Sequence, residues 1–241
     1  EKEKEDCGLK ILKLFILLMV PSRCYAQYSN HQLYQAYLTR DMNVWQQYIA
    51  SAEWEKMSNE EQKQLLNYEY GFAAYCVTKG GNDAKEMLER YENHLHASKG
   101  IIPNAEYHAY LSGLYSYKLS LDKTQLLKYS RGIFDNIKQA AELQPDNPFV
   151  LSMLGNVEFY SPFGNKKKAL EYYQKSNTLY HQMPDAKELW NVRAVQMTIV
   201  QCLAKMNRAE EAKQQCELFL KEEPNCLIFQ TLMADLTSKN L

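Results

Sequence analysis

Side chains that could support chemistry are few and stand far apart in this sequence. His94 and His96 form a His-x-His pair, but on a helix the two rings point to different faces, so we expect a solvated helix end rather than a metal site. Lysines at 166 to 168 follow Gly164-Asn165 without the Gly-x4-Gly-Lys-Ser/Thr pattern that cradles phosphate. We expect a solvated first helical turn there, with contact to an acidic partner as the alternative. The sequence therefore predicts no catalytic residue, no metal site and no cofactor.

Four cysteines lie beyond the N-terminal segment, and none belongs to a Cys-x-x-Cys pair. Neither a redox motif nor a zinc ribbon is supported. Cysteine is among the residue types most often buried, so we expect free buried thiols, while an even count in an oxidising compartment leaves disulfides as the alternative. The four are Cys76, Cys202, Cys216 and Cys226.

The charge balance and composition exclude several classes of protein. The chain has 28 basic and 29 acidic side chains, a formal charge of −1. Nucleic-acid-binding proteins usually have a basic stripe and a high isoelectric point, so we expect no such partner. A hydrophobic fraction of 46% excludes a disordered chain, and 9 glycines with 7 prolines are too few for a β-sandwich. The composition predicts an all-α protein.

The N-terminal segment has the order of a secretory signal peptide. Lys10 and Lys13 flank the apolar run Leu14–Val20, which is followed by Pro21 and by small residues before a cut after Ala26. This predicts a signal peptide over residues 1–26 and a secreted or periplasmic protein. Seven apolar residues are too few to cross a bilayer, so we expect no transmembrane span.

Two alternatives for this segment stay open. An apolar N-terminal helix could pack on the domain instead of being removed. A lipoprotein acylated at Cys24 is the weaker reading, because Arg23 stands where a small residue is expected. Association with the cell envelope is a further expectation for the mature protein.

Prolines and glycines recur at nearly constant intervals along the rest of the chain. The prolines are separated by 42, 39 and 40 residues and the glycines by 42 and 42. Proline cannot continue a helix, and glycine within a helical pattern indicates close packing, so the intervals predict stacked helix pairs, with nine to eleven helices and no sheet. The positions are Pro103, Pro145, Pro184 and Pro224, and Gly71, Gly113 and Gly155.

Local patterns predict where some of these helices begin and which face they bury. Helix starts are expected at Ser58-x-x-Glu61, Asp185-x-x-Glu188 and Asn207-x-x-Glu210, where a polar side chain is followed by an acid three residues later. Apolar residues at helical spacing predict one buried face over 122–143. They are Leu126, Ile133, Ile137, Ala140 and Ala141.

The repeats resemble tetratricopeptide repeats (TPR). The last one has Ala212-x3-Cys216-x2-Phe219 followed by Pro224, and Leu154-Gly155 supplies the Leu-Gly pair of a first helix. The resemblance implies a right-handed α-solenoid of stacked antiparallel helix pairs over 65–226, after a divergent pair at 27–64 and before a capping helix at 227–241. The repeats are degenerate, because the family's 12-residue spacing from Gly71 to Tyr91 is 20 residues here, which we attribute to longer helices or loops.

The resemblance also implies a partner site on the concave face. First-helix positions that line the TPR groove are mostly aromatic in this chain, and such rings suit contact with an extended peptide. The candidate partner-binding residues are Tyr68, Phe72, Tyr75, Tyr107, Tyr110, Tyr117, Asn156 and Phe159. The alternative is that these rings pack against one another or against the N-terminal helices.

These observations favour a non-enzymatic module that binds a protein or peptide partner in an aromatic concave groove. One alternative is a structural subunit of a cell-envelope assembly complex, which would use its convex face or its termini. A helical enzyme with an unrecognised site is the other, and it would need titratable side chains that converge on a pocket.

Overall fold

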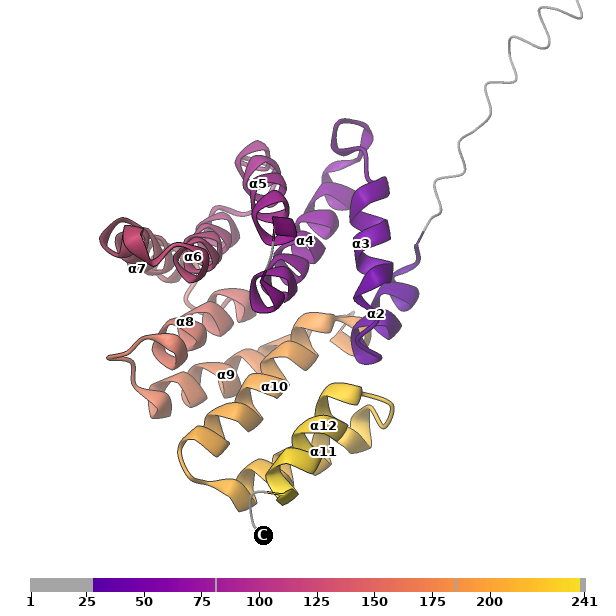
Figure 1. Cartoon of the computed structure of the whole chain (residues 1–241), viewed down its shortest axis with the longest axis vertical. Helices are drawn as coiled ribbons and strands as arrows, with labels where there is room; N and C mark the ends of the chain where they lie inside the picture. The colour runs from indigo at the N-terminus through magenta and orange to yellow at the C-terminus, as the bar shows by residue number, and fades with distance from the viewer. Residues whose placement is uncertain (1–27, 81, 185, 239–241) are drawn as a thin grey trace, which may run out of the picture.

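The computed structural model describes residues 28–80, 82–184 and 186–238, which form α-helices and short 3₁₀ turns (Figure 1). The predicted signal peptide, its alternatives and Asp185 lie outside these ranges. No strand occurs within them, as the sequence predicted, and the eleven α-helices fall in the expected range. The helices are α2 (Asn30–Leu38), α3 (Met42–Ser51), α4 (Asn59–Lys79), α5 (Asn82–Ala97), α6 (Asn104–Leu121), α7 (Leu126–Leu143), α8 (Pro148–Tyr160), α9 (Lys166–Tyr180), α10 (Trp190–Lys205), α11 (Ala209–Glu222) and α12 (Leu227–Ser238), with 3₁₀ turns η1 (Trp54–Lys56), η2 (Lys123–Gln125) and η3 (Ala186–Glu188).

Consecutive helices form hairpins that stack into an α-solenoid, as predicted. The pairs are α4–α5, α6–α7, α8–α9 and α10–α11, and α12 packs on the last pair. The first helices of neighbouring pairs run parallel, because Tyr110 of α6 meets Phe149 of α8 at a ring distance of 4.4 Å and Gly113 faces Met153 one turn further along both helices. None of the described helices is both long and apolar enough to cross a membrane.

Proline and glycine mark the repeat for the reasons the spacing suggested. Each of the four periodic prolines lies between two helices. The three periodic glycines lie where an aromatic ring of another helix presses on the backbone: a Cβ at Gly113 would lie 2.8 Å from Tyr70 Cε2, and one at Gly155 would lie 2.5 Å from Tyr173 Cε1. The interval between glycines is therefore the interval between ring-to-backbone contacts.

The three predicted helix starts differ in how well they match the structure. Ser58 caps α4, and its side chain and that of Glu61 form the expected reciprocal capping box. The start predicted at Asn207 is wrong by one residue: Asn207 has a φ of 59°, and α11 follows Arg208 without a side-chain cap. Near Glu188 the chain forms only η3, and α10 begins at Trp190.

The longer repeat comes from longer helices. α4 has 21 residues and α6 and α7 have 18 each, whereas α8 has 13. The predicted boundary between residues 64 and 65 falls inside α4. On α7 the buried face includes Ile133, Ile137 and Ala140, but the prediction for Leu126 is wrong, because this first residue of α7 lies at the turn from η2 and is 56% exposed.

A methyl group at Gly71 tests how tightly the rings press on the solenoid. A Cβ there would lie 2.8 Å from Trp45 Cζ3 and 2.9 Å from Trp190 Cη2, and both rings are buried. We expect Gly71→Ala to lower the free energy of unfolding by about 1–3 kcal/mol, because the strain of overpacking exceeds the gain in helix propensity. Denaturant unfolding measures the change.

Thr78→Ala, on an exposed turn of the same helix, is the matched control. It also raises helix propensity but meets no ring, so it should leave stability unchanged or slightly higher. A Gly71→Ala protein as stable as wild type would show that the rings can move aside.

Candidate functional site on the solenoid

The concave face of the solenoid is closed by the N-terminal hairpin α2–α3. Trp45 of α3 is fully buried, and its ring lies 5.4 Å from that of Trp190 in α10 and 4.8 Å from that of Tyr68 in α4. Its indole nitrogen donates a hydrogen bond to the Leu33 carbonyl oxygen of α2 at 2.8 Å. The hairpin therefore joins the first repeat to the last one.

A pair of amides closes the same gap directly. Asn67 of α4 and Asn191 of α10 exchange two hydrogen bonds, at 2.9 and 3.0 Å. The Tyr110 hydroxyl also donates to Asn67 Oδ1, at 3.3 Å. These bonds join the N-terminal halves of α4 and α6 to the first turn of α10, so the inner surface is packed at this level.

Arg193 holds the hairpin to the C-terminal repeat. Its Nε donates to the Tyr34 hydroxyl at 2.9 Å and its Nη1 donates to Glu222 Oε2 at 2.7 Å, while the Tyr34 hydroxyl donates to Glu223 Oε2 at 2.9 Å. The guanidinium is buried, and burial raises the pKa of Tyr34 to about 12, so the phenol stays neutral and can donate. Gln196 completes the cluster by accepting from Arg193 and donating to Glu222.

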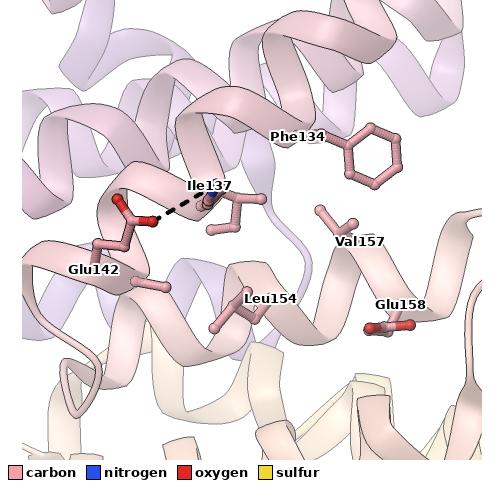
Figure 2. Close-up of a pocket in the computed structure, with 8 residues that line it drawn as sticks. Phe134, Ile137, Glu142, Leu154, Val157 and Glu158 are labelled. Carbon is pink, nitrogen blue, oxygen red and sulfur yellow. Dashed lines mark ion pairs between the residues drawn. The ribbon is translucent and has the colours of Figure 1, made fainter.

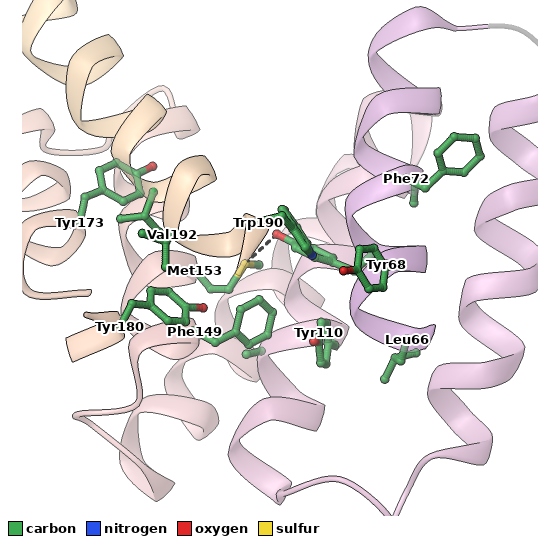
Figure 3. Close-up of a cluster of buried hydrophobic side chains, with 14 of the residues drawn as sticks. Leu66, Tyr68, Phe72, Tyr110, Phe149, Met153, Tyr173, Tyr180, Trp190 and Val192 are labelled. Carbon is green, nitrogen blue, oxygen red and sulfur yellow. Dashed lines mark hydrogen bonds between the residues drawn. The ribbon is translucent and has the colours of Figure 1, made fainter. Parts of the chain in front are cut away.

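The predicted concave residues are consequently core for the most part. Tyr70, which the groove rule did not select, lies among the rings of Tyr110, Tyr117 and Phe149 and donates a hydrogen bond to Met153 Sδ. Figure 3 shows Tyr68, Tyr110, Phe149 and Trp190 within this buried cluster. The expectation of an open aromatic groove is not met at the buried candidates, because Tyr68 packs on Trp45 of α3 and Tyr110 packs on Phe149 of α8. Five candidates are buried, namely Tyr68, Phe72, Tyr107, Tyr110 and Phe159, and three are half-buried, namely Tyr75, Tyr117 and Asn156.

His94 is not the solvated residue that the sequence predicted. Its ring stacks on Trp54 at 4.3 Å, and its Nδ1 lies 2.9 Å from the fully buried carboxylate of Glu69, which also accepts from Arg90 Nε. Arg90 in turn donates to the Ile49 carbonyl oxygen, so the cluster anchors the end of α3. Among the described residues no group of histidine, cysteine and acidic side chains is arranged to hold a metal ion.

The four cysteines are free and buried, which confirms the prediction. Burial raises the pKa of the Cys76 and Cys216 thiols to about 11. Both thiols therefore stay protonated near neutral pH, and neither is a good nucleophile, because the thiolate is the reactive form.

An outer groove between α7 and α8 is more accessible than the closed inner face of the solenoid. Its volume is about 490 Å³ (Figure 2). Its walls are largely apolar, and Phe134, half-exposed, stands over Val157 at its mouth. The charged groups at its edge are engaged in ion pairs, Lys138 with Glu142 and Glu158 with Lys168. The lining residues are Phe134, Ile137, Lys138, Ala141, Glu142, Leu154, Val157 and Glu158.

Sequence reasoning missed this groove. Ile137 and Ala141 were assigned to a buried face, and Phe134 was not used. The available signal was Phe134 itself, a large aromatic residue that lies beside that face and is not part of it.

Comparisons with known proteins concern the fold. No protein-family model matches the sequence, and no curated protein matches it. The structure is similar to that of the HusA haemophore from Porphyromonas gingivalis, with 19% sequence identity and a TM-score of 0.56 over 78% of this chain and 96% of the haemophore. It is also similar to the assembly chaperone of RpL4 (Acl4, residues 1–338), with 16% identity and a TM-score of 0.46 over 87% of this chain and 81% of that one. The first likeness supports a fold of stacked helices.

Arg193→Met tests whether the charged cluster holds the hairpin in place. The substitution leaves Glu222 and Tyr34 without their main partner, so we expect the free energy of unfolding to fall by about 3 kcal/mol. Hydrogen exchange should accelerate over residues 30–51 more than over α6 and α7. Arg208→Met is the matched control, because the Arg208–Glu211 pair is exposed and its loss should cost less than about 1 kcal/mol. Equal losses in the two variants would contradict a special role for Arg193.

Lowering the pH should weaken the attachment of the α2–α3 hairpin by protonating Glu222. Burial raises the pKa of this carboxyl, but hydrogen bonds from Arg193 and Gln196 outweigh burial and hold it below the ordinary value of 4.5. A lowered folded-state pKa contributes stability above the unfolded-state pKa, and this contribution disappears as the pH falls through the folded-state value. The stability difference between wild type and Glu222→Gln should therefore be full at neutral pH and shrink below about pH 4.5. A difference that stays constant down to acid unfolding would contradict this account.

Proposed function

We propose that this chain is a non-enzymatic binding protein built from degenerate TPR-like repeats, and that it holds a segment of a protein or peptide partner in the α7–α8 groove. The observation that carries the proposal is the half-exposed Phe134 above an apolar trough lined by Leu154 and Val157. Contact with an apolar side chain of a partner would remove these surfaces from water.

The groove has the features of a binding surface rather than of a catalytic one. Its acidic and basic groups pair with one another, so no free nucleophile or general base converges on the trough. The half-buried Tyr75, Tyr117 and Asn156 remain candidates for a second contact. The five buried candidates would need their packing partners to move first, such as Trp45 over Tyr68 and Phe149 over Tyr110.

A small apolar ligand is the second candidate, favoured by the size of the groove, which falls in the range typical of ligand pockets. The similar fold of the HusA haemophore makes haem one such ligand to test. The groove fits haem poorly, because its described lining contains no histidine, cysteine, methionine or tyrosine that could ligate the iron. A structural role in an envelope complex and a secreted or periplasmic location remain predictions.

Photo-crosslinking from the groove tests the proposal. A benzoylphenylalanine at position 134 should give discrete adducts in an extract of the producing cells, whereas one at Leu218, similarly exposed on α11, should not. Phe134→Ala should then weaken binding of the purified partner by at least about tenfold, because a central aromatic residue often dominates an interface. Unfolding measurements should show no change, since the ring is half in solvent.

Three outcomes would count against a protein partner in this groove. One is the same adducts from positions 134 and 218, and another is unchanged affinity in Phe134→Ala. The third is saturable haem or fatty-acid binding that Phe134→Ala abolishes, which would favour the small-ligand candidate.

A further inference from the structure

The turns that join the first and second helix of each pair gather at one edge of the solenoid. The parallel contacts Tyr110–Phe149 and Gly113–Met153 place the ends of α6 and α8 side by side. The Cys202 thiol donates to the Lys166 carbonyl oxygen at 3.1 Å, which places the end of α10 beside the start of α9. We call residues 121–131 and 158–168, at the two central turns, the basic edge.

Among the described residues, the most exposed large apolar side chains lie on this edge. Phe163, in the α8–α9 turn, is 99% exposed, and Leu127, in the first turn of α7, is 88% exposed. α7 and α8 run antiparallel along the groove, with Phe134 beside Val157 (Figure 2). Leu127 precedes Phe134 by two helical turns on the same face, so it lies level with the α8–α9 turn that carries Phe163.

The turn holds Phe163 outward in a defined conformation. The Gly164 amide donates to the Ser161 carbonyl oxygen at 3.1 Å, and the Asn165 amide donates to Glu158 Oε2 at 2.9 Å. A Cβ at Gly164 would lie 2.0 Å from the Glu158 carbonyl oxygen, so the turn is folded tightly on the end of α8. The turn therefore presents the Phe163 ring to solvent, where contact with another apolar surface would remove it from water.

The charge at this edge differs from that of the rest of the protein. Each of the two segments carries three basic residues and one acidic residue, whereas the whole chain has 28 and 29. Lys123 and Lys167 are exposed and form no ion pair within the described ranges. The opposite edge is acidic, since residues 142–147 and 217–223 together carry five acids and one lysine.

We propose that the basic edge binds the surface of an anionic lipid bilayer, with Phe163 and Leu127 entering the interface and the lysines meeting the headgroups. Exposed aromatic and aliphatic side chains flanked by lysines suit this surface. Insertion of the apolar side chains and attraction of the lysines to acidic lipids both contribute to the binding free energy. The groove lining shares only Glu158 with the basic edge and includes neither Phe163 nor Leu127, so the two proposals can fail independently.

Vesicle cosedimentation of the full chain tests the proposal. The protein should bind vesicles of equal parts phosphatidylcholine and phosphatidylglycerol and bind pure phosphatidylcholine weakly. Phe163→Ala should reduce partitioning at least about fivefold, and Lys123→Glu with Lys167→Glu should reduce it more than about tenfold. Lys187→Glu in η3 with Lys221→Glu in the last turn of α11 is the charge-matched control, because both lysines lie near turns that join successive pairs and so are remote from the basic edge. This variant should leave binding within about twofold.

Several outcomes would overturn the proposal. They are equal binding to neutral and anionic vesicles, wild-type binding by Phe163→Ala, and a loss in the control variant as large as in the basic-edge variant. A Phe163-dependent dimer in light scattering without vesicle binding would instead assign the edge to a second copy of the chain. Phe134→Ala should bind vesicles normally, which separates this test from that of the groove.

Discussion

The packing of Trp45 against Trp190 is the contact on which the rest of the structure depends. Trp45 belongs to the short N-terminal hairpin and Trp190 begins the helix of the last pair, and both are buried. Gly71 lets both indoles reach the backbone of α4, where a methyl group would collide with them. One ring-to-ring contact therefore determines where α2–α3 sit and joins the two ends of the solenoid.

Polar contacts fix how the helices around the Trp45–Trp190 contact align with one another. Packing of the indole rings buries a large area but is not directional, so it allows the helices to shift along one another. Hydrogen bonds are directional, and those between Asn67 and Asn191 and from the Arg193 guanidinium form in only one alignment of the helices. Each such group would be costly to bury alone, so the cluster forms fully or the hairpin leaves. Aromatic area and charged hydrogen bonds thus stabilise the same interface for different reasons.

The sequence was informative wherever the cause is local. Proline and glycine intervals predicted the stacked pairs because a proline ends a helix and a periodic glycine meets a ring, and Ser58 with Glu61 predicted the start of α4. The same spacing could not tell whether Tyr68 and Tyr110 face a groove or a core. For Tyr68 that depends on Trp45, which itself packs on Trp190, 145 positions further along the chain. For Tyr110 it depends on Phe149 in the next pair, and no local pattern reveals these contacts. Asn207 failed because a positive φ moved the helix start by one residue.

Closure of the inner face changes where binding can occur. A solenoid with an open inner surface offers side chains from every repeat to one ligand, but here the aromatic side chains that would do so already contact one another. The accessible apolar surface includes the outer trough under Phe134 and the turn that carries Phe163. The trough is lined by side chains of both α7 and α8, and the turn follows the C-terminal end of α8. Partner contact is therefore expected where the second helix of one pair meets the first helix of the next, rather than on the inner face.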